Sequence, residues 1–369
     1  MLSYKFRIYP SKTVQAKLQE HLELCRRLYN RLLEELNTVK SAGRKLGQKE
    51  TQRLIVELKK QKPEIGNVYS KVLQMVNCQL WGNIRALASM KKNGRKIGKL
   101  RFKGAWFKTL NYNQSGFKLD GKKLRLSKIG EVNVKLHRAL MGEIKGVIIK
   151  RELSGKWHAI FQCENTANPL PEVNKSIGMD VGLKHFLSDS DGRQVENPRF
   201  YEKTLFKIRE AQRELSRKKK GSKNREKQKV KLACLYEKLV GQRNDFLHKL
   251  SRFYVNNYDV IAVEDLNITN MVRDSNLAGK ILDASWGKFL QMLSYKAENA
   301  GRTIVKVNPR GTSKEYKHGE LDRDYNASLN ILERGLSALG RRFEPVEMRP
   351  LLAVPASIIV EAGSPCPSG

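Results

Sequence analysis

The sequence has few of the features that mark membrane, secreted or zinc-binding proteins. No apolar run approaches the about 20 residues that a membrane-spanning helix needs. The first ten residues alternate apolar and basic side chains and contain no signal-peptide core. The cysteines are too far apart for the paired spacing of a zinc site, at Cys25, Cys78, Cys163, Cys234 and Cys366. We therefore expect free thiols and neither a zinc site nor a membrane partner.

Acidic residues are also scarce. The 369 residues include 37 Asp and Glu against 71 Lys and Arg, which gives a formal net charge of +34. A surface this positive repels itself unless a polyanion neutralises it, so the expected partner is nucleic acid. We expect a cytoplasmic, nucleoid-associated protein of a prokaryote. A plain structural RNA-binding protein would have the same charge, so the charge predicts a class of partner and no chemistry.

The first 165 residues or so combine short strands with helices. Residues 4–9 alternate apolar and polar side chains, which predicts a half-exposed strand that Pro10 ends. Helical spacing of apolar residues follows over about 13–36, and helical patterns continue to about residue 91. Two predicted hairpins, 117–126 and 147–163, then return the chain to strands. This pattern predicts a strand-rich, barrel-like module with a helical insertion.

Residues 174–334 have a more diagnostic order of elements. Three strands come first, at 177–183, 186–188 and 193–196. They are followed by helical stretches and apolar strands in alternation: 201–256 (helical), 260–263 (strand), 284–300 (helical), 303–307 (strand) and 325–332 (helical). Three antiparallel strands followed by helix–strand–helix–strand–helix is the order of the RNase H-like fold. The remaining residues, about 341–369, are rich in Pro, Gly and Ser and are predicted to form a disordered tail.

A cluster of basic residues interrupts the long helical stretch. Residues 216–229 are predicted to form the turn of a helical hairpin. A solvated charged loop is the plainer interpretation, but the rest of the chain is basic as well. We therefore favour contact with phosphate groups by the three lysines of this turn, Lys218, Lys219 and Lys220.

Three acidic residues stand among apolar neighbours. Asp180 lies inside the strand 177–182, Glu264 ends the apolar run 260–263, and Asp324 opens the last helical pattern. An ionised carboxylate at the edge of a core costs several kcal/mol unless it is paired or binds a cation. Mg²⁺ prefers carboxylate oxygens and removes the repulsion between them. We therefore predict that these three residues are catalytic and bind Mg²⁺ (or Mn²⁺).

Three such acids suit two-metal hydrolysis of a phosphodiester. Two ions about 3.5–4 Å apart activate a water on one side of the phosphorus and stabilise the leaving oxygen on the other. We assign Asp180 as the bridging ligand because its strand is predicted to lie between the other two positions. Each acid also has a plainer interpretation: a salt bridge for Asp180, a strand end for Glu264, and a helix N-cap for Asp322 or Asp324. The choice between Asp322 and Asp324 stays open.

The order and spacing of the acidic segments match a known family. Gly178-Met-Asp-Val-Gly-Leu-Lys184, Val263-Glu-Asp-Leu266 and Asp322-Arg-Asp-Tyr-Asn-Ala-Ser328 resemble the three RuvC motifs of TnpB proteins. These are transposon-encoded relatives of the miniature type V CRISPR effectors. The resemblance runs from residue 2 to about residue 335 and includes five further segments: 4–10, 101–104, 286–289, 295–297 and 307–313.

The resemblance implies an α/β multidomain architecture with an RNase H-like (RuvC) nuclease domain. The implied domains are a wedge-type β-barrel over 1–12 and 92–170, a helical recognition module over 13–91, the RuvC nuclease over 171–338 and the disordered tail over 339–369. It implies a guide RNA made from the transposon end. It also implies cleavage of guide-matched double-stranded DNA next to a short transposon-adjacent motif, with Asp180, Glu264 and Asp324 as the catalytic acids. In such systems base pairing reads the sequence, and the protein reads shape and a short motif.

One departure from the family concerns zinc. The family usually carries a four-cysteine zinc ribbon between the Thr-Ser pair and the third acidic motif. Here only residues 314–321 separate Ser313 from Asp322, so the ribbon is missing, either lost in this lineage or removed by design. His318 alone does not replace it, because structural zinc takes four ligands.

Two alternatives to a nuclease stay open. The protein would be an RNA-guided DNA-binding protein if the missing ribbon impairs cleavage, or an RNase H-like transposase if it binds transposon ends without RNA. For nucleic-acid contacts we single out basic and aromatic side chains near two of the family-like segments: Lys5, Arg7, Tyr9, Arg101 and Lys103. Any barrel strand shows the same alternation, so this interpretation competes with a purely structural one.

Overall fold

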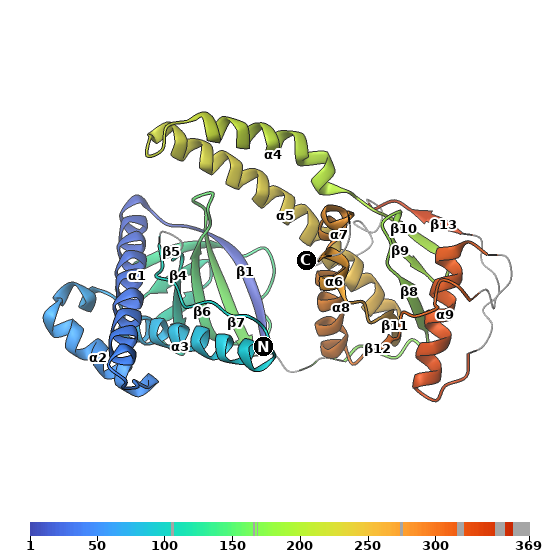
Figure 1. The fold of residues 1–369 in the computed structure, drawn as a ribbon, viewed down its shortest axis with the longest axis horizontal. Helices are drawn as coiled ribbons and strands as arrows, with labels where there is room; N and C mark the ends of the chain where they lie inside the picture. The colour runs from blue at the N-terminus through green and yellow to red at the C-terminus, as the bar shows by residue number, and fades with distance from the viewer. Residues whose placement is uncertain are drawn as a thin grey trace. The chain divides into compact units, whose positions relative to one another are not determined.

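A computed structural model describes residues 1–104, 107–164, 167, 169–273, 276–315, 321–343 and 351–356. The chain divides into two compact units, residues 1–166 and 167–369, and each is described by itself (Figure 1). No helix among these residues combines the length and the apolar character needed to cross a membrane.

Unit 1 is built on one antiparallel sheet of seven strands in the order β2-β6-β7-β1-β5-β4-β3. The strands are β1 (Leu2–Tyr9), β2 (Thr109–Asn113), β3 (Phe117–Asp120), β4 (Lys123–Leu126), β5 (Gly130–Lys135), β6 (Glu143–Arg151) and β7 (Trp157–Glu164). Both predicted hairpins are confirmed, since β3 pairs with β4 and β6 with β7. The sheet nearly closes on itself, and the Tyr112 hydroxyl of β2 donates to the Ser127 carbonyl just beyond β4 (3.3 Å).

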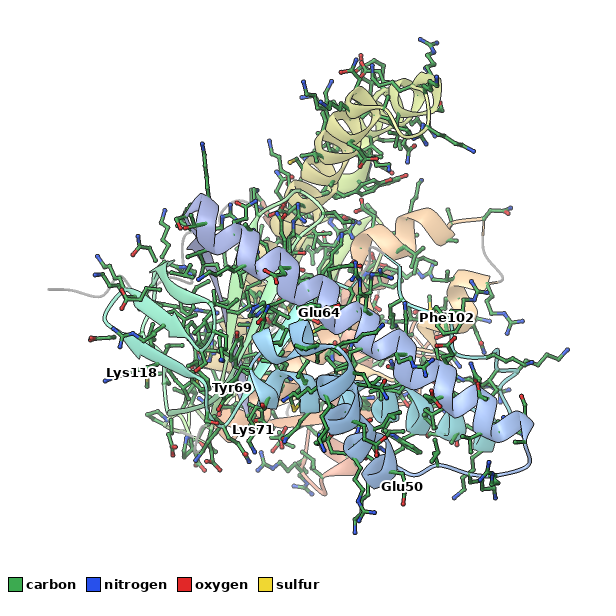
Figure 2. All side chains as sticks on the ribbon, turned by 90° about the vertical axis from the view of Figure 1, so that its left-hand side faces the viewer. Glu50, Glu64, Tyr69, Lys71, Phe102 and Lys118 are labelled. Carbon is green, nitrogen blue, oxygen red and sulfur yellow. The ribbon has the colours of Figure 1, made fainter. Side chains whose placement is uncertain are left out.

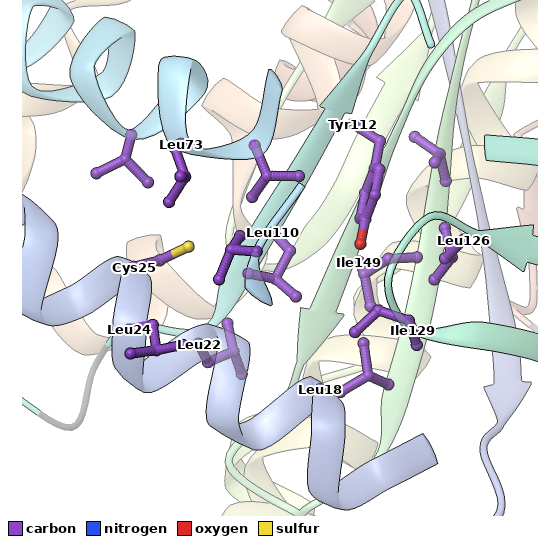
Figure 3. Packing of buried hydrophobic residues seen from close by; sticks show 14 of the residues in the cluster. Leu18, Leu22, Leu24, Cys25, Leu73, Leu110, Tyr112, Leu126, Ile129 and Ile149 are labelled. Atoms are coloured by element: carbon purple, nitrogen blue, oxygen red, sulfur yellow. The ribbon is translucent and has the colours of Figure 1, made fainter. Parts of the chain in front are cut away.

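Three helices and one 3-10 turn cover unit 1: α1 (Lys12–Ser41), α2 (Gln48–Gln61), η1 (Pro63–Asn67) and α3 (Ser70–Lys92). Ser11 caps α1, because its hydroxyl accepts from the backbone N–H of Val14. Leu18, Leu22 and Cys25 of α1 are buried with apolar side chains of the sheet (Figure 3). Burial raises the pKa of the Cys25 thiol to about 12, so it is an inert core residue.

Unit 2 contains a six-stranded mixed sheet in the order β12-β11-β8-β9-β10-β13. Its strands are β8 (Ser176–Asp180), β9 (His185–Asp189), β10 (Arg193–Glu196), β11 (Val260–Glu264), β12 (Thr303–Val307) and β13 (Leu352–Val354). β8, β9 and β10 run antiparallel, whereas β8, β11 and β12 run parallel. This is the element order that the sequence predicts for residues 174–334.

The helices of unit 2 lie between and after these strands. They are α4 (Phe200–Arg217), α5 (Lys223–Asn257), α6 (Ile268–Arg273), α7 (Ala278–Ala284), α8 (Trp286–Ala300) and α9 (Arg323–Ala338). The predicted helical hairpin is confirmed, since α4 and α5 pack as an antiparallel pair (Figure 1). Its turn is shorter than the predicted 216–229 and covers 218–222, because Ser222 caps α5 and residues 223–229 belong to that helix. Phe246, Leu250 and Tyr254 of α5 are buried with Phe289 of α8 in the main core of the unit.

Helix α9 packs very closely on the sheet because two glycines allow it. A Cβ atom on Gly178 of β8 would lie 2.1 Å from the Ser328 carbonyl oxygen and 2.7 Å from the Leu332 backbone nitrogen. A Cβ atom on Gly335 of α9 would lie 2.5 Å from the Cβ of Ala262 in β11. The missing side chains therefore allow the middle and the last turns of α9 to lie close against β8 and β11.

The predicted tail differs from the structure in one place. Strand β13 pairs in parallel with β10, and Gln194 lies opposite Ala353, so residues 352–354 are not disordered. The cause is local: Leu352-Ala-Val354 is a short apolar run, and the edge of β10 offers free backbone hydrogen-bonding groups. Residues 344–350 and 357–369 of the predicted tail lie outside the described residues.

Candidate active site

The three acids of the sequence prediction come together at one end of the sheet in unit 2. Asp180 is the last residue of β8 and Glu264 the last residue of the neighbouring parallel strand β11, with Met179 opposite Val263. The carboxyl ends of parallel strands lie at the same edge of a sheet. Asp324 lies in the first turn of α9, one turn before Ser328, whose carbonyl rests on Gly178.

The structure separates the roles of Asp322 and Asp324. Asp322 is the N-cap of α9, and its carboxylate accepts from the backbone N–H groups of Asp324 (3.1 Å) and Tyr325 (3.2 Å). The same carboxylate accepts from the Gln194 amide (3.1 Å). Asp324 is left with its carboxylate near Asp180 and at the positive end of the helix. Asp322 is thus the helix cap and Asp324 the candidate ligand.

The charges of the three acids act on one another. Burial raises the pKa of the Asp180 carboxyl to about 8, and the negative charges of Glu264 and Asp324 add to this rise. Arg323 and a hydrogen bond from the Val181 backbone oppose it but do not cancel it. Neighbouring carboxylates that raise one another's pKa mark a candidate functional site, because a bound cation would remove the repulsion between their negative charges.

Glu264 has a hydrogen-bond partner that the sequence did not reveal. The Thr312 hydroxyl lies 2.5 Å from Glu264 Oε1, and both residues are buried. Burial raises the pKa of Glu264, while the Thr312 hydrogen bond and the charge of Arg334 lower it. Thr312 lies within the family-like segment 307–313, but a loop residue with no acidic or basic group gave no signal of its own.

The donor set fits a hard divalent cation. Asp180, Glu264 and Asp324 supply only carboxylate oxygens, and in the described residues neither Asp180 nor Asp324 forms an ion pair with a Lys or Arg. Over the same residues, no three His, Cys, Asp or Glu side chains are close enough to hold a metal ion as they stand.

The predicted nucleic-acid contacts on β1 are largely occupied within unit 1. Lys5 pairs with Glu152 (2.6 Å), and Arg7 donates to the Trp157 carbonyl (3.0 Å). The Arg7 guanidinium also lies 5.3 Å from the centre of the Tyr9 ring, which is 54% exposed. Of this group, Tyr9 is the residue most available for a partner.

Arg101 and Lys103 belong to a short segment that is held on α1. Asn30 accepts from the Lys103 backbone N–H (2.7 Å) and donates to its carbonyl (2.9 Å), and Arg26 donates to the same carbonyl (3.1 Å). The Lys103 ammonium lies over the Tyr29 ring. The segment presents an exposed Arg101 and a 58% exposed Phe102 at the surface (Figure 2).

A basic cleft in unit 1 was not predicted from the sequence. It has a volume of about 580 Å³ between α1 and strands β3 to β5, and its basic lining residues are Lys17, Lys118, Arg125 and Lys128. Arg125 pairs with Glu131, whereas the three lysines have no ion-pair partner among the described residues. Phe117 adds an aromatic ring to the lining. Lys118 is labelled on the hairpin in Figure 2. The residues lie in α1, β3, β4 and the turn before β5, so no single motif revealed them.

The lysines at the tip of the helical hairpin are placed as the sequence predicts. Lys219 and Lys220 are exposed in the turn between α4 and α5, and Lys218 is half-buried. The Lys218 carbonyl accepts from Arg225 of α5 (3.0 Å), which fixes the turn. These three residues are far in the sequence from the acids, and their role in binding stays a prediction.

Three protein-family models match the chain. A model described as "Probable transposase" matches residues 160–275, one described as "Cas12f1-like, TNB domain" matches 286–331, and one described as "Helix-turn-helix domain" matches 1–45. Over 1–45 the described structure consists of β1 and the long helix α1. The match over 286–331 extends across the stretch where the sequence contains no cysteine.

Two relatives resemble the chain over nearly its whole length. A "Putative RNA-guided DNA endonuclease" of Streptomyces pristinaespiralis is 28% identical over 363 residues, 91% of this chain and 90% of the relative. InsQ of Escherichia coli K12, which has the same description, is 26% identical over 404 residues, 97% of this chain and 98% of the relative.

Among solved structures, a Cas12f1–sgRNA–target DNA complex is similar, with a TM-score of 0.52 and 13% identity over 85% of this chain and 82% of that one. The chain therefore has a Cas12-like α/β fold. The three family models and the two full-length relatives together show that it belongs to the TnpB family of transposon-encoded proteins.

Proposed function

We propose that the protein is an RNA-guided DNA endonuclease that hydrolyses phosphodiesters of guide-matched DNA at a RuvC site. The observation that carries the proposal is the meeting of Asp180, Glu264 and Asp324 at one end of an RNase H-like arrangement of strands. The names of the two full-length relatives and the net charge of +34 support the nucleic-acid partners. The guide is proposed to come from the transposon end, and the target to lie next to a short DNA motif.

The residues of the site have separable roles. Asp180, Glu264 and Asp324 would hold Mg²⁺ or Mn²⁺. Bound metal ions activate water and stabilise the leaving oxygen in phosphodiester hydrolysis. Thr312 keeps Glu264 oriented, and Asp322 keeps the first turn of α9, and hence Asp324, in place. Gly178 sets the distance between that helix and β8.

Nucleic-acid contacts are proposed at four places. In unit 1 they are the exposed Tyr9 with Lys5 and Arg7, the segment with Arg101 and Lys103, and the basic cleft around Lys118. In unit 2 they are the lysines 218–220 of the α4–α5 turn. Exposed aromatic rings beside basic side chains suit base stacking combined with phosphate pairing.

The experiment that tests the proposed function is cleavage by the protein purified with its coexpressed RNA. With Mg²⁺, the wild type is expected to cut a plasmid that matches the guide and to leave a mismatched plasmid intact. Asp180→Ala is expected to retain the RNA and to bind the matched plasmid without cutting it. If neither protein cuts and both bind the matched plasmid, the protein is a guided DNA-binding protein. Absence of copurified RNA would instead favour an RNase H-like transposase.

The two aspartates at the start of α9 provide a matched pair of variants. Asn caps helices as well as Asp does, so Asp322→Asn is expected to leave the melting temperature unchanged. Its cleavage rate is expected to stay within about threefold of wild type. Asp324→Asn removes a proposed ligand without removing the cap. It is expected to lower cleavage by at least about 100-fold at an unchanged melting temperature. Equal losses in both variants would contradict the division of roles between Asp322 and Asp324.

A further inference from the structure

Three side chains on one face of α9 hold the loop that follows β12. Asn326 donates to the Glu315 carbonyl (2.7 Å), and Asn330 donates to the carbonyls of Glu315 (2.7 Å) and Thr312 (2.8 Å). One turn further along, Arg334 donates to the carbonyls of residues 308 (3.0 Å) and 310 (2.8 Å). Residues four apart on a helix lie on the same face. We call Asn326, Asn330 and Arg334 the α9 ladder.

The ladder leaves buried polar atoms without partners. In the described part of the chain, the Oδ1 atoms of Asn326 and Asn330 are buried and accept no hydrogen bond. A buried acceptor without a partner costs about 1–3 kcal/mol. The amide donors of the two side chains offset this cost, because they satisfy the backbone carbonyls of Thr312 and Glu315 in the loop.

The loop in turn holds Thr312 against Glu264. The Thr312 hydroxyl lies 2.5 Å from Glu264 Oε1 and 2.9 Å from the Pro309 carbonyl oxygen. The hydroxyl has one proton to donate, and an ionised carboxylate is the stronger acceptor. The loop can approach α9 this closely because position 311 is a glycine with φ +86°. A Cβ there would lie 3.0 Å from the Glu315 carboxylate.

We propose that Thr312 is a positioning residue for Glu264, and that the α9 ladder fixes the loop 308–315 so that the Thr312 hydroxyl stays on that carboxylate. This inference rests on the proposed function, in which Glu264 is a metal ligand. Groups that hydrogen-bond to a metal ligand orient it, and their loss costs about 10–100-fold in metal affinity or activity.

Only residues 314–321 connect Ser313 to Asp322, so a short segment joins this loop to the start of α9. Side chains of α9 make six hydrogen bonds to residues 308–315. Three of the six reach Glu315, one of them from Arg334 to the Glu315 carboxylate (2.9 Å). The same helix therefore carries Asp324 and fixes the loop that orients Glu264.

Isosteric substitutions separate the hydroxyl and the amide donors from packing. Thr312→Val removes the hydroxyl at constant shape, and Thr312→Ser retains it. Asn330→Leu removes both amide donors at a similar size without adding a charge, and Ser337→Ala on the exposed end of α9 is the control. We expect Thr312→Val and Asn330→Leu to lower the cleavage rate about 10–100-fold and to weaken Mn²⁺ binding to a similar extent. Thr312→Ser and Ser337→Ala are expected to stay within about threefold of wild type.

The measurements are cleavage of guide-matched plasmid, Mn²⁺ binding followed by electron paramagnetic resonance, and target-DNA binding without metal. A positioning role predicts that cleavage and Mn²⁺ binding fall together while DNA binding is unchanged. The inference is overturned if Thr312→Val binds Mn²⁺ and cuts like wild type, or if Thr312→Ser loses as much as Thr312→Val.

Asp180→Ala, run in parallel, distinguishes this failure from failure of the proposed function. If the wild type neither cuts nor binds Mn²⁺, the proposed function itself is wrong. If the wild type cuts and binds Mn²⁺ and Asp180→Ala does neither, the proposed function stands. The comparison of Thr312→Val with Thr312→Ser then tests the positioning role. Should Thr312→Val not fold, the same outcomes are decided by comparing Asn330→Leu with Ser337→Ala.

Discussion

Replacing Asp180 with asparagine is expected to stabilise the metal-free protein above pH 8. Burial and the charges of Glu264 and Asp324 raise the pKa of this carboxyl to about 8 in the folded chain, from 3.8 in the reference state. The folded protein therefore binds a proton more tightly than the unfolded chain does. The wild type loses stability as the pH rises from about 4 to about 8, and the loss is complete above that range. Asparagine has no ionisable proton, so the Asp180→Asn protein does not lose stability in this way.

The melting temperature in EDTA as a function of pH measures this difference. One unit of pKa corresponds to about 1.4 kcal/mol, so a shift of this size predicts a melting temperature about 5–10 °C higher for Asp180→Asn at pH 9. The two proteins should melt together below pH 4. Asp245→Asn, at an exposed aspartate of α5, is the control with no expected effect. Mg²⁺ should stabilise the wild type and not Asp180→Asn. Identical melting curves at every pH would refute the electrostatic account of the site.

Replacing Gly178 with alanine is expected to damage both stability and cleavage. The new Cβ would lie 2.1 Å from the Ser328 carbonyl oxygen and 2.7 Å from the Leu332 nitrogen, and neither backbone atom can rotate away. Helix α9 must move outward as a whole, which costs about 1–3 kcal/mol or more. The same movement takes Asp324 away from Asp180, and a displacement of 1 Å in a catalytic site costs about 100-fold in rate.

Gly241 provides the matched control for this substitution. It lies inside α5, and a Cβ atom there would meet nothing within 4 Å. Gly241→Ala is expected to stabilise the protein by about 0.5–1 kcal/mol, because alanine favours helix. Thermal melting and the plasmid-cleavage rate of both variants test the prediction. A Gly178→Ala protein that melts and cuts like wild type would show that α9 does not depend on this close contact.

Much of the fold could be predicted from the sequence because the relevant patterns are local. The apolar run 260–263 predicts a buried parallel strand, and β11 is that strand. The basic break after residue 216 predicts a hairpin turn, and α4 and α5 meet there. Strands β2 and β5 were not predicted, although Leu110 and Tyr112 of β2 and Val132 and Val134 of β5 alternate with polar residues. Each pattern contains only two apolar residues, and pairing with β6 and β1 completes the strands. Strand β13 was wrongly included in a disordered tail because its three residues are too few to show a pattern.

The site shows the same division between local and non-local information. Asp180 and Glu264 could be singled out because each is an acid at the edge of an apolar strand. The sequence left Asp322 and Asp324 unresolved, because the distinction depends on which residue begins α9 and differs by only two positions. Thr312 was missed because its contact with Glu264 spans 48 residues and depends on how α9 holds a loop. The strand patterns predicted where the acids lie, but they did not predict the hydrogen bonds that hold the acids in place.

We propose that Asp180, Glu264 and Asp324 together bind the divalent cation that cleavage requires. Mn²⁺ binding by the purified complex of protein, RNA and guide-matched DNA tests this directly, measured by electron paramagnetic resonance for the wild type and for Asp180→Ala. Mn²⁺ is expected to bind to the wild-type complex and to be lost from the Asp180→Ala complex, with both complexes containing the same RNA and DNA. Equal Mn²⁺ binding by the two complexes would contradict it.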